Sequence, residues 1–287
     1  WWDYGHWITV DGNRTPVANP FQDNAKPAAQ FLLAQNESRA DEVLANLSDG
    51  ENRDVRYVMV DWQMATGGSA GKSFAPPAFV DGVSASDYYH SVYPAQQTAS
   101  GVSVNRPFAL YKQPYYESMA ARLYRFHGSS QAAVPIVTQW EESLQTETAD
   151  GQRQTVKSTP LRSNTSLVDF YTRQGIQQAR QAANNSTTAQ VGGLGPFPGE
   201  RVSALDHYRL VQASERNSGP LASIHPNLAR AVRNGFQIPG LAAQNLGVFG
   251  ERNPRWVKVF ERVPGATIDG SGPANATVTA SATMDIP

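Results

Sequence analysis

The sequence predicts an α+β fold, with a mainly helical central core into which β-strands are inserted. Several segments repeat apolar residues at helical spacing, and others are short apolar runs bounded by turns, which is typical of buried strands. The final segment alternates apolar and polar residues, as a half-buried strand does. At 287 residues and 40% hydrophobic composition, the chain can form one large or two modest folded units.

Helices are predicted where apolar side chains recur three or four residues apart. The segment from Glu37 to Leu47 places Ala40, Val43 and Leu44 on one face, and the Asp-Gly pair that follows is expected to end it. A second clear pattern has a proline in its first turn and a glycine just beyond its last. That second pattern covers 114–127, and the other predicted helices cover 25–34 and 168–183.

Strands are predicted at two short apolar runs, Arg56 to Trp62 and Arg255 to Arg262. Further strands or extended segments are expected at 107–113 and 134–142, and 205–214 is expected to be a short strand or helix. The polar stretch 145–159 carries an Asp-Gly turn and is typical of a hairpin tip or a mobile loop. The stretch 184–199 is rich in Asn, Ser, Thr, Gly and Pro and is expected to be a linker.

The composition changes at Pro264 and divides the chain unequally. Residues 1–263 are expected to form the central core, with a β-rich insertion around 134–160. Residues 264–287 are expected to be a linker and the first strand, 276–284, of a truncated peripheral β-unit. The side chains Val278, Ala280 and Ala282 would share one face of that strand.

Charge and composition exclude several classes of function. The 24 basic and 25 acidic residues nearly balance, and no basic patch favours nucleic acid. The absence of cysteine removes disulfides, thiolate metal sites and cysteine nucleophiles. No run of about 18 apolar residues predicts a bilayer span. A chain that opens on a tryptophan pair rather than methionine is typical of a piece of a longer protein.

The first five residues, Trp1-Trp2-Asp3-Tyr4-Gly5, carry the most specific pattern in the chain. Indole N–H groups donate hydrogen bonds and a carboxylate accepts them, so this group can hold a polar moiety against an apolar wall. The structural alternative is an aromatic cluster that packs an end of the chain onto the core. The exact order resembles, without substitution, the signature motif of the oligosaccharyltransferase catalytic subunit family, and the four residues that follow it resemble archaeal members.

A second stretch, from Asp61 to Lys72, is similar to another motif of that family. Some archaeal members carry an insert between an Asp and a Lys, as here between Asp61 and Lys72, with Met64 near its start. The alternative is an Asp that caps a turn, a core Met and a solvated Lys. The glycine-rich insert does not match a phosphate loop, because Thr66 stands where the first glycine is required.

The family resemblance implies a function. Such enzymes transfer a lipid-linked oligosaccharide to the Asn of Asn-x-Ser/Thr sequons on the extracytoplasmic face of the cell membrane, where the motif belongs to a soluble domain of a multi-pass protein. Trp1, Trp2 and Asp3 would bind the Ser/Thr hydroxyl of the acceptor peptide. Tyr4 and Gly5 would shape the turn, and Asp61, Met64 and Lys72 would lie near the same pocket.

The resemblance also implies what this chain lacks. A divalent metal, Mn or Mg, would be held by carboxylates of the membrane-embedded part, which also binds the lipid-linked oligosaccharide. The chain itself would hold no catalytic residue and no metal, and alone it would be inactive. The alternative is a non-enzymatic carbohydrate- or peptide-binding module that uses exposed aromatic side chains.

Overall fold

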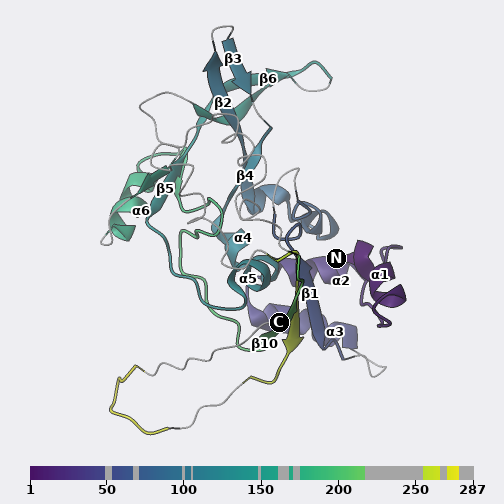
Figure 1. Cartoon of the computed structure of the whole chain (residues 1–287). Helices are drawn as coiled ribbons and strands as arrows, with labels where there is room; N and C mark the ends of the chain where they lie inside the picture. The colour runs from purple at the N-terminus through teal and green to yellow at the C-terminus, as the bar shows by residue number, and fades with distance from the viewer. Residues whose placement is uncertain are drawn as a thin grey trace.

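Over the residues that it describes, a computed structural model shows an α+β arrangement of short helices and three small sheets, which confirms the predicted class (Figure 1). The structure describes residues 1–48, 54–66, 71–98, 101–104, 106–147, 150–160, 168–170, 175–216, 255–265 and 270–277.

The helical segments gather mainly in the first half of the chain. The α-helices are α1 (Gly5–Val10), α2 (Ala25–Leu33), α3 (Glu37–Ser48), α4 (Gln113–Glu117), α5 (Met119–Phe126) and α6 (Ile176–Asn184). Short 3-10 turns are η1 (Trp2–Tyr4), η3 (Pro76–Phe79) and η4 (Ala85–Asp87).

The described strands form three sheets. They are β1 (Tyr57–Asp61), β2 (Tyr89–Thr98), β3 (Gly101–Val104), β4 (Phe108–Tyr111), β5 (Ile136–Gln139), β6 (Glu141–Glu147), β7 (Arg153–Pro160), β8 (Val168–Phe170), β9 (Ala189–Val191), β10 (Tyr208–Ala213) and β11 (Val257–Arg262). The sheet orders are β1-β11-β10, β3-β2-β7-β6 with β4 paired to β2, and β8-β5-β9.

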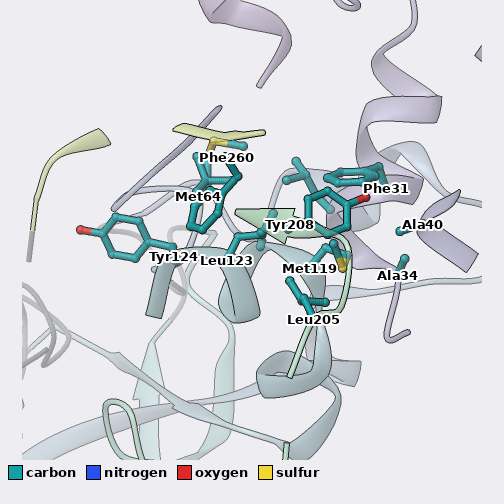
Figure 2. Packing of buried hydrophobic residues seen from close by; sticks show 14 of the residues in the cluster. Phe31, Ala34, Ala40, Met64, Met119, Leu123, Tyr124, Leu205, Tyr208 and Phe260 are labelled. Carbon is teal, nitrogen blue, oxygen red and sulfur yellow. The ribbon is translucent and has the colours of Figure 1, made fainter. Parts of the chain in front are cut away.

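The first sheet carries the main core. Strand β11 pairs antiparallel with β1 on one side and β10 on the other, so segments about 200 residues apart in sequence lie side by side. Helices α2, α3 and α5 contribute apolar side chains, including Phe31, Leu44 and Leu123, to the same buried cluster as Phe260 of β11. Figure 2 shows Met64, from the loop after β1, beside Phe260 in this cluster. The core therefore fixes the end of β1.

The other two sheets lie away from α1–α3 in Figure 1. Strand β2 pairs with β4 at its start, with β7 in its middle and with β3 at its end, and of these three pairings only β2–β7 is parallel. The stretch 145–159, predicted to be a hairpin tip or a mobile loop, holds the end of β6 and most of β7, and these two strands pair antiparallel. The predicted boundaries of the β-rich insertion, 134–160, stay a prediction, and its sheet also includes strand β2 from earlier in the chain.

The predicted helix over 114–127 is two helices. Ser118 between α4 and α5 has ψ 145°, which is extended, and its hydroxyl accepts a hydrogen bond from the Ala121 N–H at 3.3 Å. The apolar spacing continues across the break, because Tyr115, Met119 and Leu123 are all buried. Periodicity alone therefore could not reveal the interruption.

Other predicted boundaries also change. The helix predicted over 168–183 is wrong at its start, because 168–170 form strand β8 against β5, and α6 begins only at Ile176. The predicted linker 184–199 contains strand β9, which pairs with the other side of β5. The segment 205–214 is strand β10. The predicted strand 276–284 lies mostly outside the described residues.

Candidate functional site

The opening motif is helical, which the sequence did not predict. Trp2 to Tyr4 form the 3-10 turn η1, and α1 follows directly from Gly5. The motif's glycine is required by close packing rather than by backbone conformation, since its φ is −55°. A Cβ on Gly5 would lie 2.3 Å from the Ala18 carbonyl oxygen. The turn therefore lies so close to the backbone of residues 18–19 that position 5 has no room for a side chain.

The structure brings the two predicted motifs together. Asp61 is the last residue of β1, and Met64 and Lys72 belong to the loop that follows it. The Lys72 Nζ donates a hydrogen bond to Asp3 Oδ2 at 2.5 Å and to the Tyr4 hydroxyl at 2.9 Å. Part of the intervening Gly/Ser insert, residues 67–70, lies outside the described ranges.

Tyr4 is the link between the motifs. Its hydroxyl accepts from Lys72 and donates to Asp61 Oδ2 at 2.5 Å. The other Asp61 oxygen accepts from the Met64 backbone N–H at 2.8 Å. Asp61 is 7% exposed and both of its oxygens are engaged within the chain, so it orients Tyr4 and the loop. The hydrogen bonds run in series from Asp3 through Lys72 and Tyr4 to Asp61.

The surroundings of Tyr4 and Lys72 raise the pKa of both side chains. Burial, together with the hydrogen bond to Asp61, raises the pKa of the Tyr4 phenol to about 12. Burial opposes the charge of Lys72, but its hydrogen bonds to Asp3 and Tyr4 outweigh this effect, and the pKa of the ammonium is raised. Lys72 therefore stays charged and Tyr4 stays protonated throughout the physiological range.

Replacing Tyr4 by phenylalanine (Tyr4→Phe) is expected to make the free energy of unfolding fall less steeply as the pH rises above about 10. A pKa of about 12 in the folded state lies above the ordinary value of 10.0, so the contribution is complete below about pH 10 and lost as pH rises through 12. The variant should remove at most about 1.4 kcal/mol per pH unit of slope in the free energy of unfolding, reduced by solvent screening. Urea unfolding at about pH 9, 10 and 11 measures this slope. Tyr57→Phe, which changes a 51% exposed tyrosine, is the control and should leave the slope near wild type; an unchanged slope in Tyr4→Phe would contradict the assignment.

Three aromatic rings pack beside the hydrogen-bonded series. The Trp1 and Trp2 rings are 6.2 Å apart, and Phe79 from η3 meets Trp1 edge-on at 5.5 Å and Trp2 at 6.5 Å. All three side chains are half-buried, so the tryptophans are neither fully packed into the core nor free in solvent. Phe79 was missed by sequence reasoning. The Pro-Pro pair at 76–77, just before it, carries no signal of an aromatic contact.

Trp2 and Asp3 each keep one buried polar atom without a partner. Among the described residues, neither Trp2 Nε1 nor Asp3 Oδ1 has a hydrogen-bond partner, although both atoms are inaccessible to solvent. A buried polar group that lacks a partner is costly, by roughly 1–3 kcal/mol. The motif thus offers one donor and one acceptor on adjacent residues, which suits a group that can both donate and accept, such as a hydroxyl.

Met64 lies beneath the motif. It is 5% exposed and belongs to the main core cluster, and its Sδ is 3.7 Å from the Trp1 nitrogen. Met64 is therefore a core residue, as the structural alternative predicted, and its sulfur also contacts Trp1, the first residue of the motif.

The described parts of the chain offer neither a metal site nor a membrane span. Across these ranges, no three His, Asp or Glu side chains gather in a way that could hold a metal ion. Likewise, none of the helices in the described ranges has the length and apolar character needed to cross a bilayer.

Comparison with known proteins relates the chain to archaeal glycotransferases. Residues 1–65 match the family model described as the AglB core domain. The chain is 47% identical over 288 aligned residues to the dolichyl-monophosphooligosaccharide–protein glycotransferase AglB of Haloferax volcanii, an alignment that covers 99% of this chain and 26% of that protein. The chain thus spans about a quarter of the length of this curated relative.

Two solved structures from Archaeoglobus fulgidus are also similar. An oligosaccharyltransferase in complex with Zn and sulfate matches 91% of this chain and 29% of its own, with 21% identity and a TM-score of 0.45. The oligosaccharyltransferase AglB in complex with an inhibitory peptide and a dolichol-phosphate matches 93% of this chain and 27% of its own, with 23% identity and a TM-score of 0.42. By its sequence relation over nearly its whole length and by the matched AglB core domain, this chain is related to a segment of the archaeal AglB glycotransferases.

Proposed function

We propose that this chain is the acceptor-recognition part of an oligosaccharyltransferase, which transfers a lipid-linked oligosaccharide to the Asn of Asn-x-Ser/Thr sequons. The site would bind the Ser or Thr hydroxyl two residues after the acceptor Asn. The observation that carries this proposal is the pair of unpartnered buried atoms, Trp2 Nε1 and Asp3 Oδ1. A hydroxyl would accept from the indole N–H and donate to the carboxylate, satisfying both atoms at once.

Lys72 and Tyr4 hold Asp3 for this task. Asp3 accepts from Lys72 through Oδ2, which leaves Oδ1 for the peptide. Asp61 fixes the Tyr4 phenol from the other side, so the four polar groups act as one preorganised unit.

The aromatic rings supply the apolar wall. Trp1, Trp2 and Phe79 are held against one another, and Met64 supports Trp1 from the core side. An apolar neighbour of this kind would contact the methyl group of a Thr, a contribution of about 0.8 kcal/mol for one buried carbon. On this basis the site would bind Thr in preference to Ser.

Bond formation would take place with residues outside this chain. A divalent metal, Mn or Mg, would be held there on carboxylates, and the lipid-linked oligosaccharide would bind to the same membrane-embedded part. The metal would supply charge stabilisation when bound. The residues described in this chain would bind and orient the peptide. The assembled enzyme would act on the extracytoplasmic face of the archaeal cell membrane.

A comparison of acceptor peptides tests the proposed site. Binding of a peptide with Asn-x-Thr to the full-length enzyme should be about tenfold tighter than binding of the same peptide with Asn-x-Val, because Val matches Thr in shape but lacks the hydroxyl. Photo-crosslinking or fluorescence titration gives the two dissociation constants. A third peptide with Gln in place of the acceptor Asn, Gln-x-Thr, should keep most of the Thr advantage over Gln-x-Val. Equal binding of the Thr and Val peptides would contradict the proposal.

A further inference from the structure

We propose that Tyr115 and Arg125 are positioning residues that clamp the backbone of the turn after β1, and through it set the place of Asp61 and Lys72 in the recognition site. This inference rests on the proposed function, since it concerns how the acceptor site is held. Neither side chain belongs to the two motifs, and both lie in helices distant from them in sequence.

The clamp closes on one carbonyl oxygen. The Tyr115 hydroxyl donates a hydrogen bond to the Ala65 oxygen, and Arg125 Nη2 donates to the same oxygen at 3.0 Å. Arg125 Nε also donates to the Tyr115 hydroxyl at 2.5 Å, so the three groups form a closed triangle. Ala65 is fully buried, and Tyr115 and Arg125 are 3% and 5% exposed. Two buried donors on one buried oxygen leave the turn little freedom to move.

The clamped turn carries the second motif. Its start is fixed where Asp61 Oδ1 accepts from the Met64 N–H. The Gln63 carbonyl then accepts from the Thr66 N–H at 3.1 Å and from the Lys72 N–H at 2.8 Å. Displacement of the turn would therefore move the Lys72 backbone as well. Because Lys72 Nζ holds Asp3, a shift of the turn reaches the first motif.

The scaffold around the clamp is aromatic and rigid. The Tyr115 ring stacks on Tyr111 with centroids 3.8 Å apart and planes within 16°. The Arg125 guanidinium lies 5.2 Å from the Tyr111 ring centroid and 5.6 Å from that of Tyr115. The helix break at Ser118 places Tyr115 on α4 and Arg125 on α5, so the two donors reach the oxygen from different helices. This arrangement supports the proposal that the buried guanidinium of Arg125 holds the turn in place.

The matched pair Tyr115→Phe and Tyr116→Phe in the full-length enzyme tests the clamp. Each change removes one buried hydroxyl and keeps the ring, and Tyr116 donates to the Gly195 carbonyl at 3.0 Å, away from the turn. Tyr115→Phe should raise the KM for a sequon peptide about threefold to tenfold with kcat within about twofold, since the variant loses the hydrogen bonds of the hydroxyl with Ala65 and Arg125, which loosens the site without touching the reacting atoms. Amide hydrogen exchange over residues 62–66 should also become faster. Tyr116→Phe should leave both readouts near wild type.

The outcomes separate this inference from the proposed function. Equal KM and equal exchange in Tyr115→Phe and Tyr116→Phe would overturn the clamp, as would faster exchange in Tyr115→Phe with an unchanged KM. Asp3→Ala is measured in the same assay. A strong loss with Asp3→Ala but none with Tyr115→Phe would refute only the clamp. Normal transfer by Asp3→Ala would refute the proposed function. The clamp would then be judged by amide hydrogen exchange alone, and unchanged exchange in Tyr115→Phe would refute it.

Discussion

Asp3→Ala in the full-length enzyme is expected to lower the transfer of oligosaccharide to a sequon peptide by about 10²-fold to 10³-fold. The change removes the acceptor for the peptide hydroxyl and leaves Lys72 without the carboxylate that lies 2.5 Å from its Nζ. Loss of a hydrogen bond to a charged group costs roughly 1.5–3 kcal/mol, and the partner left behind adds to this cost. The loss should appear in kcat/KM for the acceptor peptide, with the apparent affinity for the lipid-linked donor near wild type.

Two companion variants sharpen this experiment. Asp3→Asn keeps an oxygen that can accept from the hydroxyl but loses the charge that pairs with Lys72, so its activity should fall between wild type and Asp3→Ala. Asp11→Ala removes an exposed carboxylate at the end of α1 and should stay near wild type. Near-normal transfer by Asp3→Ala would show that the motif does not select the acceptor.

Gly71→Ala is expected to lower transfer by about tenfold to a hundredfold and to reduce thermal stability. A Cβ at Gly71 would lie 1.9 Å from the Thr66 carbonyl oxygen and 2.5 Å from its carbon, and both are backbone atoms. The backbone must therefore move, at a cost of roughly 1–3 kcal/mol for an overpacked site. Lys72 is the next residue, so its contacts with Asp3 and Tyr4 would move with it. Peptide transfer and a melting curve measure the two effects.

Gly270→Ala is the matched control for this change. A Cβ at Gly270 would meet no atom within 4 Å, so the same substitution should alter neither activity nor stability measurably. Retention of both wild-type activity and wild-type stability by Gly71→Ala would show that the close approach to Thr66 is not required.

Much of the fold could be predicted from local pattern. The helices α2 and α3 and the strands β1 and β11 lie where apolar spacing placed them. The break at Ser118 could not be predicted, because Tyr115, Met119 and Leu123 continue the helical spacing across it. The strand at 168–170 was also mistaken for helix. A segment of three residues takes its conformation from the strand that it pairs with, and β5 lies about 30 residues away in the sequence.

The candidate site, like the fold, could be predicted only in part from the sequence. The first motif is recognisable because its five residues are consecutive, and Asp61, Met64 and Lys72 were proposed from a family pattern. The resemblance placed them near the same pocket, but their contacts were not accessible from the sequence, since 57 positions separate Tyr4 from Asp61 and 69 separate Asp3 from Lys72. Phe79 was missed altogether, and no spacing in the sequence links it to Trp1.

The sequence by itself determined which groups are available: the tryptophan pair, the carboxylate of Asp3 and the short apolar runs that form the central sheet. Only the tertiary structure decided what these groups do. It joined Asp3 to Lys72, placed Tyr4 between Lys72 and Asp61, and set Tyr115 and Arg125 on the turn that carries the second motif. The physical reason is that a hydrogen bond depends on the distance and direction between two atoms. For residues far apart in the chain, those are set by the packing of the whole core.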